Sequence, residues 1–222
     1  MKGRAVVAID GAAGSGKSTL ARALSRRLGL AYVNTGLMYR ALAAAALRAD
    51  VSPDDAQALL ELTGGLRCRL VGSDPPVLEV EGYTLEELTS LEVESTVSRV
   101  ARHPRVRAAM CEMQRDLASE GAVMEGRDIG SVVFPDAAVK LYLVAEHGAR
   151  AERRADERPH AQGLVEEALR RRDALDAQTN PFEPPEGAEV LDTGLLDAEA
   201  TLASAEAIVS VRAPWLAERR RP

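Results

Sequence analysis

A glycine-rich segment near the start of the chain has the residues needed to bind the phosphates of a nucleotide. It reads Gly11-Ala-Ala-Gly14-Ser-Gly16-Lys17-Ser18 and matches the pattern G-x-x-x-x-G-K-[ST] at every fixed position. Glycines let successive backbone N–H groups turn toward phosphate oxygens, the lysine neutralises their charge, and the hydroxyl can ligate Mg²⁺. The predicted ATP-binding residues are Gly11, Ala12, Ala13, Gly14, Ser15, Gly16, Lys17, Ser18 and Thr19, with Lys17 as a catalytic candidate and Ser18 as the metal candidate.

The residues on either side of this loop predict the strand and the helix that such a loop requires. Residues 4–10 form a short apolar run, which is typical of a strand buried in a parallel sheet. Residues 17–28 have the pattern of a helix, and Gly29 is placed to end it. A second strand over residues 30–34 and a helix beyond Gly36 complete a βαβ unit. An ordinary glycine-rich turn is the alternative interpretation, but this context favours nucleotide binding.

Further segments carry polar and charged side chains where a second substrate could bind. Residues 35–40 lie where the second predicted strand gives way to a helix, and thus at the carboxyl edge of a parallel sheet. Residues 103–107 begin a predicted helix, residues 125–130 end the next core strand, and residues 172–176 lie late on a charged helix. The sequence contains neither the N-K-x-D motif of GTPases nor the LSGGQ-type signature of transport ATPases. These residues favour a small kinase, which needs an acceptor site and a basic lid.

The rest of the chain predicts one α/β domain with an insertion. Two short strands around a Ser-Asp-Pro-Pro turn predict an antiparallel hairpin, and two helices follow it over residues 91–101 and 105–119. Together they predict a subdomain over about residues 60–119 that is inserted into the parallel core. The core resumes with strands 122–126 and 138–144, helices 150–157 and 164–177, a last strand 188–193 and a closing helix 197–211.

Composition excludes several classes of protein. The chain has 222 residues, of which 46% are hydrophobic, so a disordered or fibrous protein is excluded. Aromatic residues make up 3% and the net charge is −6, which argues against a stable nucleic-acid partner and against an anionic membrane surface. Cys68 and Cys111 have no metal-ligand spacing and predict reduced thiols. No apolar stretch approaches the ~20 residues of a membrane span, and the chain is predicted to be cytoplasmic.

Several of these segments together resemble bacterial cytidylate kinases, and the resemblance extends over nearly the whole chain. The most specific piece is GRDIGSVVFPDA at residues 126–137, followed by TGLMYR at residues 35–40 and HPRVR at residues 103–107. The resemblance implies an α/β, three-layer P-loop kinase fold with a parallel central sheet flanked by helices. It also implies that the inserted region binds CMP and that about residues 148–164 form a short lid.

The resemblance further implies a reaction and the residues that carry it. The family transfers the γ-phosphate of ATP to CMP or dCMP with Mg²⁺ and acts as a monomer. Carried over to this sequence, the acceptor site consists of Ser98, Arg107 and Asp128 at the cytosine ring, Thr35 near the acceptor, Arg40 and Arg127 at its phosphate, and Arg172 and Asp176 at the sugar hydroxyls. The lid contains Arg150, Arg153, Arg154 and Arg158, of which Arg153 and Arg154 are the catalytic candidates.

The sequence departs from the family pattern at one clear position. Three residues after Asp176, many members have an arginine that contacts the acceptor phosphate, whereas this chain has Thr179. A neighbouring lid arginine could replace that contact. Ser131, where a threonine is common, is a mild change.

Some of these residues also have purely structural interpretations. Asp128 could form an ion pair with Arg127 at the end of a strand. Arg172 and Asp176 are four residues apart, a spacing at which opposite charges on a helix often only support its surface. Glu125 is predicted to be structural. Two rival functions also stand beside the kinase: phosphorylation of another small acceptor, and a non-enzymatic ATP-dependent switch.

Overall fold

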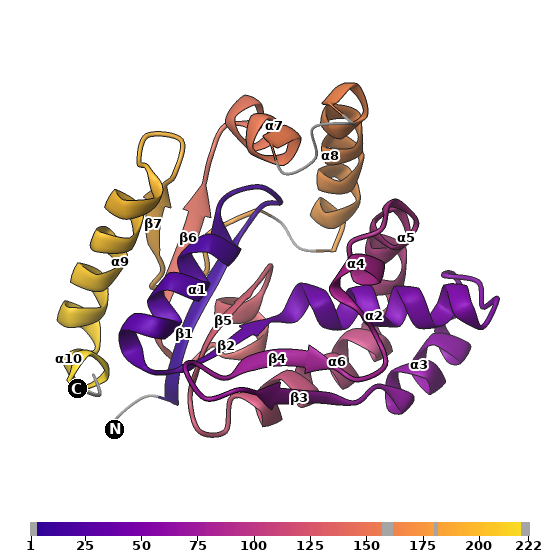
Figure 1. Ribbon diagram of the computed structural model, residues 1–222, viewed down its shortest axis with the longest axis horizontal. Helices are drawn as coiled ribbons and strands as arrows, with labels where there is room; N and C mark the ends of the chain where they lie inside the picture. The colour runs from indigo at the N-terminus through magenta and orange to yellow at the C-terminus, as the bar shows by residue number, and fades with distance from the viewer. Residues whose placement is uncertain (1–3, 157–161, 180–181, 219–222) are drawn as a thin grey trace.

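A mostly parallel sheet lies at the centre of the molecule (Figure 1). The computed structural model describes residues 4–156, 162–179 and 182–218. The strands in these residues are β1 Arg4–Gly11, β2 Ala31–Asn34, β3 Cys68–Val71, β4 Val77–Val80, β5 Ala122–Gly126, β6 Ala137–Val144 and β7 Glu189–Asp192. Their order in the sheet is β3-β4-β2-β5-β1-β6-β7, and every neighbouring pair is parallel except β3 with β4.

Helices cover both faces of the sheet, and each face has its own hydrophobic core (Figure 1). Side chains alternate along a strand, so Val7 and Ile9 of β1 belong to one core while Val6 and Ala8 belong to the other. The first core is completed by α1 (Lys17–Leu28), α9 (Ala198–Arg212) and α10 (Pro214–Ala217). The second is completed by α2 (Thr35–Arg48), α3 (Ala56–Gly65), α4 (Leu85–Leu88), α5 (Leu91–Ala101) and α6 (Pro104–Leu117).

The carboxyl ends of β1, β2 and β5 meet at one edge of the sheet. A loop leads from β1 into α1, and a short segment leads from β5 into η1 (Ile129–Val133), a short π-helix, whereas β2 passes directly into α2. Above this edge in Figure 1 lie α7 (His147–Asp156) and α8 (Gln162–Ala177). An edge of this kind, at the carboxyl ends of parallel strands, is where open α/β sheets bind their ligands.

The predicted α/β fold is confirmed, and the structure adds elements that the sequence patterns missed. Gly29 ends α1 in the left-handed conformation, at φ 61°, as its position predicts. The hairpin of β3 and β4 extends the central sheet because β4 pairs in parallel with β2. It is therefore continuous with the core, and the division into an inserted region and a lid stays a prediction. The helices α3 and α4 and the π-helix η1 were not anticipated.

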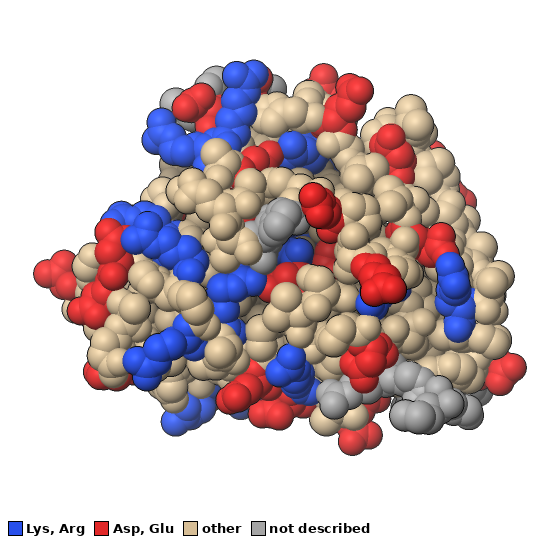
Figure 2. Space-filling view, turned by 180° about the vertical axis from the view of Figure 1, so that it is seen from behind, with Lys and Arg blue, Asp and Glu red and all other residues tan. Residues whose placement is uncertain are grey.

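On the face of the molecule in Figure 2, acidic and basic side chains are interspersed. None of the described helices is both long enough and apolar enough to cross a membrane.

Candidate functional site

The glycine-rich segment forms a loop between β1 and α1 in a conformation that requires glycine. Gly11, Gly14 and Gly16 have φ angles of 147°, 75° and 88°, which L side chains rarely adopt. A Cβ atom at Gly11 would also lie 2.4 Å from the carbonyl oxygen of Leu143 on β6. The helix that follows begins at Lys17 and has no acidic residue in its first turn. Its N-terminus is therefore suited to bind an anion.

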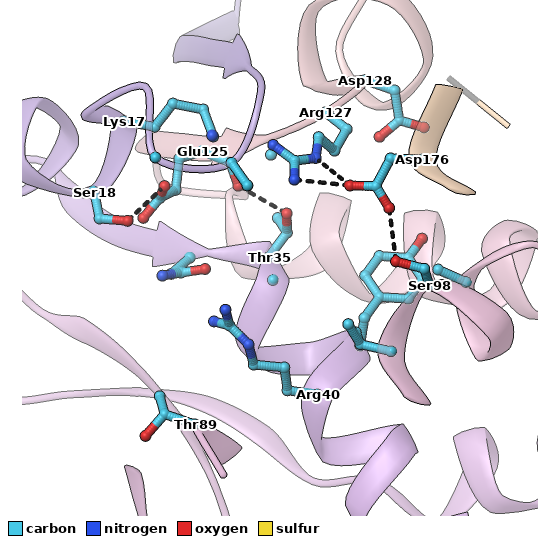
Figure 3. A pocket seen from close by; sticks show the side chains of 18 of the residues that line it. Lys17, Ser18, Thr35, Arg40, Thr89, Ser98, Glu125, Arg127, Asp128 and Asp176 are labelled. Carbon is cyan, nitrogen blue, oxygen red and sulfur yellow. Dashed lines mark hydrogen bonds and ion pairs between the residues drawn. The ribbon is translucent and has the colours of Figure 1, made fainter. Parts of the chain in front are cut away.

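This loop forms one side of a cavity of about 460 Å³ (Figure 3). The Lys17 ammonium group donates a 2.6 Å hydrogen bond to the carbonyl oxygen of Ala12, so its charge lies against the loop. The predicted ATP-binding residues that line the cavity are Ala13, Gly14, Gly16, Lys17, Ser18 and Thr19. Gly11, Ala12 and Ser15 belong to the same loop without lining the cavity.

Ser18 and Glu125 bring a hydroxyl and a carboxylate together beside the loop (Figure 3). The Ser18 hydroxyl donates a 2.9 Å hydrogen bond to one carboxylate oxygen of Glu125, and the Tyr32 hydroxyl donates a 2.6 Å bond to the other. Burial, together with the Glu125 charge, raises the pKa of Tyr32, so this hydroxyl remains a donor at neutral pH. Glu125 lies in the cavity wall, whereas sequence reasoning assigned it only a structural role.

The chemistry of this pair fits Mg²⁺. A hydroxyl and a carboxylate are hard oxygen ligands, and Mg²⁺ in nucleotide sites is held by one or two such groups, by substrate phosphates and by water. Within the part of the chain that the structure describes, no group of three or more His, Cys, Asp or Glu side chains could hold a metal ion. A metal at Ser18 and Glu125 would therefore depend on phosphate oxygens to complete its shell.

Arg107 and Asp128 form an ion pair in another part of the cavity wall. Arg107 comes from α6, and Asp128 lies in the short segment between β5 and η1. Their side chains are only 16% and 12% exposed. Burial raises the pKa of Asp128, while the neighbouring Arg107 guanidinium opposes that shift. The pair presents hydrogen-bond donors and an acceptor side by side. Its Asp128 lies at the side of Figure 3 away from Lys17 and Ser18.

A second network connects the phosphate loop with α8 and α5 (Figure 3). The Arg127 guanidinium donates hydrogen bonds of 3.0 and 2.8 Å to one carboxylate oxygen of Asp176. Its third donor lies 2.6 Å from the carbonyl oxygen of Gly11. The Ser98 hydroxyl donates a 2.8 Å bond to the other oxygen of Asp176. Arg127 therefore lies between the loop and the side chains from the two helices.

Thr35 and Arg40 reach the same cavity from the start of α2. The Thr35 hydroxyl donates a 2.7 Å hydrogen bond to the backbone carbonyl of Glu125, which fixes α2 against β5. Arg40 forms an ion pair with Glu94 of α5 at 3.3 Å. The cavity is also lined by residues that sequence reasoning did not assign: Asn34, Tyr39, Thr89, Val97 and Ala101. Asn34 directly precedes the TGLMYR motif and Tyr39 belongs to it, so this motif is the sequence signal that could have identified both residues.

The arginines of α7 differ in what they contact. Arg153 lines the cavity, and its guanidinium donates to the hydroxyl of Thr193 at 3.0 Å and also to its carbonyl oxygen. Arg150 is 8% exposed and binds the carbonyl oxygen of Ala13 at 3.0 Å and Asp173 of α8 at 2.8 Å. Arg150 therefore joins α7 and α8 to the phosphate loop. The side chains of Arg154, Arg158 and Arg172 lie outside the described residues.

The structure decides between ion pairs that the sequence left open. The direct partner of Asp128 is Arg107, and Arg127 pairs with Asp176 instead. The simple strand-end pair between Arg127 and Asp128 is therefore not formed. Thr179 is half-buried after α8 and is not among the residues that line the cavity.

A phosphate loop and a separate set of polar and ionic side chains in one cavity define a P-loop phosphotransferase with an acceptor site. The family model described as cytidylate kinase matches residues 7–210. A cytidylate kinase of Granulibacter bethesdensis is 42% identical over 221 residues, covering 96% of this chain and 99% of the relative. One of Thermus thermophilus is 44% identical over 199 residues, covering 86% and 91%. The chain belongs to the cytidylate kinase family, so the resemblance noted in the sequence is confirmed.

Proposed function

We propose that this chain transfers the γ-phosphate of ATP to CMP or dCMP and produces ADP with CDP or dCDP. The observation that carries the proposal is a single cavity with the phosphate loop on one side and the Arg107–Asp128 pair in another part of its wall. Membership of the cytidylate kinase family supports the same assignment.

Base recognition follows from hydrogen-bond polarity. Cytosine presents an amino donor at N4 and acceptors at N3 and O2. The Asp128 carboxylate accepts from the amino group, and the Arg107 guanidinium donates to N3 and O2. Uracil has an acceptor at O4 and a donor at N3. The Asp128 carboxylate would therefore face an acceptor and the Arg107 guanidinium a donor, and both contacts would disfavour uracil. Each mismatch costs about 1–3 kcal/mol because it leaves a desolvated polar group unpaired.

The acceptor phosphate and sugar are assigned to the residues around Arg127. Arg127 and Arg40 bind the acceptor phosphate, and the Thr35 hydroxyl lies close to it. Asp176, with Arg172, holds the sugar hydroxyls, which requires the bonds from Ser98 and Arg127 to Asp176 to adjust when the nucleotide binds. The existing network supports this assignment because hydrogen bonds of 2.8–3.0 Å already join Asp176 to Arg127 and Ser98.

Catalysis depends on positioning and on charge neutralisation, since phosphoryl transfer leaves the protein little covalent chemistry. An oxygen of the CMP phosphate attacks the γ-phosphorus in line with the bond that breaks. That phosphate is largely ionised at neutral pH, so no strong general base is required. Lys17 and the lid arginines Arg153 and Arg154 stabilise the charge that spreads over the transferred group. Closure of the lid would exclude water and limit hydrolysis of ATP.

Ser18 and Glu125 would hold the Mg²⁺ ion that accompanies ATP. When bound, Mg²⁺ neutralises charge on the β- and γ-phosphate oxygens. The residues of this chain orient it: Tyr32 fixes the Glu125 carboxylate through its 2.6 Å hydrogen bond. The active form is proposed to be a monomer, as the resemblance to cytidylate kinases implies.

An ATP-coupled assay with CMP, dCMP, UMP, AMP and dTMP tests the proposal. We expect CMP to exceed UMP in kcat/KM by at least ~100-fold if both base contacts operate. Comparable rates with several bases would contradict the assignment of Arg107 and Asp128. ATP consumption that does not depend on CMP would favour the non-enzymatic switch.

A further inference from the structure

Asp10 is a buried carboxylate that none of the steps above uses. It lies at the end of β1, directly before the phosphate loop, and is only 1% exposed. One of its oxygens accepts a 2.8 Å hydrogen bond from the backbone N–H of Ile129, and the other accepts a 2.7 Å bond from that of Gly130. Asp10 therefore holds the start of η1, which lies about 120 positions further along the chain.

The start of η1 lacks the cap that its own sequence could supply. Asp128 occupies the N-cap position, where aspartate is among the most favourable residues because its carboxylate can accept from the N–H group of the second or third helical residue, here Gly130 or Ser131. Here the Asp128 side chain makes no capping bond and pairs with Arg107 instead. The two N–H groups that follow it are bonded to Asp10.

We propose that Asp10 is a positioning residue: it caps η1 in place of Asp128 and thereby keeps the Asp128 carboxylate directed to Arg107 and the cavity. This inference rests on the proposed recognition of cytosine by Asp128. It assigns Asp10 to base selectivity although Asp10 does not line the cavity.

The packing around Gly130 explains how the two segments approach so closely. A Cβ atom at Gly130 would lie 3.3 Å from an oxygen of Asp10 and 3.2 Å from the side chains of Lys140 and Pro185. A larger residue would therefore press against the carboxylate that accepts its N–H. Glycine allows the backbone to reach the end of β1.

Burial of the Asp10 carboxylate is also energetically unfavourable. Burial raises its pKa to about 6, although the N–H groups of Gly130 and Ile129 and the charge of Lys17 oppose the shift, and the charge of Asp128 adds to it. An apolar residue would avoid this cost but could accept neither hydrogen bond. Asp10 thus lowers the stability of the fold but supplies hydrogen-bond acceptors for the N–H groups of Ile129 and Gly130.

Loss of Asp10 should act on Asp128. The variant Asp10→Asn retains the size of the side chain but places an amide donor against one of the two N–H groups. Asp128 then has a free N–H group within its own turn and can cap the helix itself, which turns its carboxylate away from Arg107. We expect the CMP-to-UMP ratio of kcat/KM to fall by about tenfold, chiefly through CMP, because one base contact is lost. The KM for ATP should stay within about twofold, because the phosphate loop keeps its own contacts.

The experiment compares the parent protein, Asp10→Asn, Asp128→Asn and the double variant. Val7→Ala is the matched control: it lies on the same strand, is fully buried on the opposite face of the sheet and lowers stability without touching η1. Each protein is assayed with CMP and UMP, and hydrogen exchange is measured for the amides of residues 129 and 130. If Asp10→Asn does not accumulate as a folded protein, Asp10→Ala replaces it, because alanine places no donor against the N–H groups.

The expected result is a lower CMP-to-UMP ratio and faster exchange at residues 129 and 130 in Asp10→Asn, with neither change in Val7→Ala. In the Asp128→Asn background the Asp10 substitution should have no further effect on the CMP-to-UMP ratio, because Asp10 affects selectivity only through Asp128. An unchanged ratio in Asp10→Asn, or additive effects in the double variant, would overturn the inference. If Asp128→Asn itself leaves the ratio of the parent unchanged, the proposed recognition of cytosine fails first, and the role of Asp10 fails with it.

Discussion

The two sides of the cavity are built in different ways. The side proposed to bind ATP, here called the donor side, is formed mainly by one continuous segment, from Gly11 to Ser18, which offers backbone groups and a single ammonium group. The side proposed to bind CMP, here called the acceptor side, is assembled from α2, α5, α6, α8 and the segment after β5, and several of its side chains are joined by ion pairs. A backbone loop binds a phosphate whatever base it carries, whereas paired side chains can distinguish one base from another. Substitutions should therefore affect rate at one side and selectivity at the other.

The largest effect is expected for Lys17→Ala on the donor side. Its charge is directed to phosphates rather than to packing, so kcat/KM should fall by ~100- to 1,000-fold with every nucleotide tested. The CMP-to-UMP ratio should stay near that of the parent, and the melting temperature should change little. Near-normal turnover in the folded variant would contradict the assignment of residues 11–18 as the loop that binds the ATP phosphates.

On the acceptor side, Asp128→Asn should change selectivity. An amide can turn and donate to O4 of uracil, so the variant should lose CMP activity and narrow the CMP-to-UMP ratio by about tenfold or more. Steady-state kinetics with both nucleotides measures this. If total activity falls and the ratio does not move, Asp128 is a structural partner of Arg107 and the contrast between the two sides is wrong.

A smaller effect is expected for Glu125→Gln, which tests the metal ligands on the donor side. The neutral amide should raise the Mg²⁺ concentration for half-maximal activity by about tenfold, because one anionic oxygen is lost. Binding of Mn²⁺ with ATP, followed by electron paramagnetic resonance, gives a readout apart from turnover. Tyr32→Phe is the matched control, since it removes the 2.6 Å hydrogen bond and keeps the carboxylate. Equal metal affinity in Glu125→Gln and the parent would exclude Glu125 as a ligand.

The smallest effect is expected for Thr179→Arg. An added cation near the dianionic phosphate of CMP should lower the KM for CMP a few-fold and make it more sensitive to salt. The KM for ATP should not change. If the KM for CMP is the same in both proteins at low and at high salt, position 179 does not face the phosphate, and a lid arginine supplies that contact.

The two sides also differ in how far they could be predicted. The phosphate loop, its strand and its helix lie where the sequence pattern places them, since residue types and spacing within about 25 residues are enough to identify all three. The candidate acceptor residues come from the family resemblance, and most of them line the cavity. The ion-pair partners of these residues were not predicted. Glu125 was assigned only a structural role because its contact with Ser18 spans 107 positions.

What the sequence determined by itself is the local chemistry: glycines that can adopt positive φ, a lysine at a helix start, and strands long enough to form a parallel sheet. These depend on near neighbours, so residue type and spacing are sufficient. The ion pairs of Asp128 with Arg107 and of Arg127 with Asp176, and the cap that Asp10 provides about 120 residues along the chain, follow from the folded arrangement instead. A charged side chain can pair with any opposite charge, and the choice among several is made by which strands and helices the fold brings to one edge of the sheet.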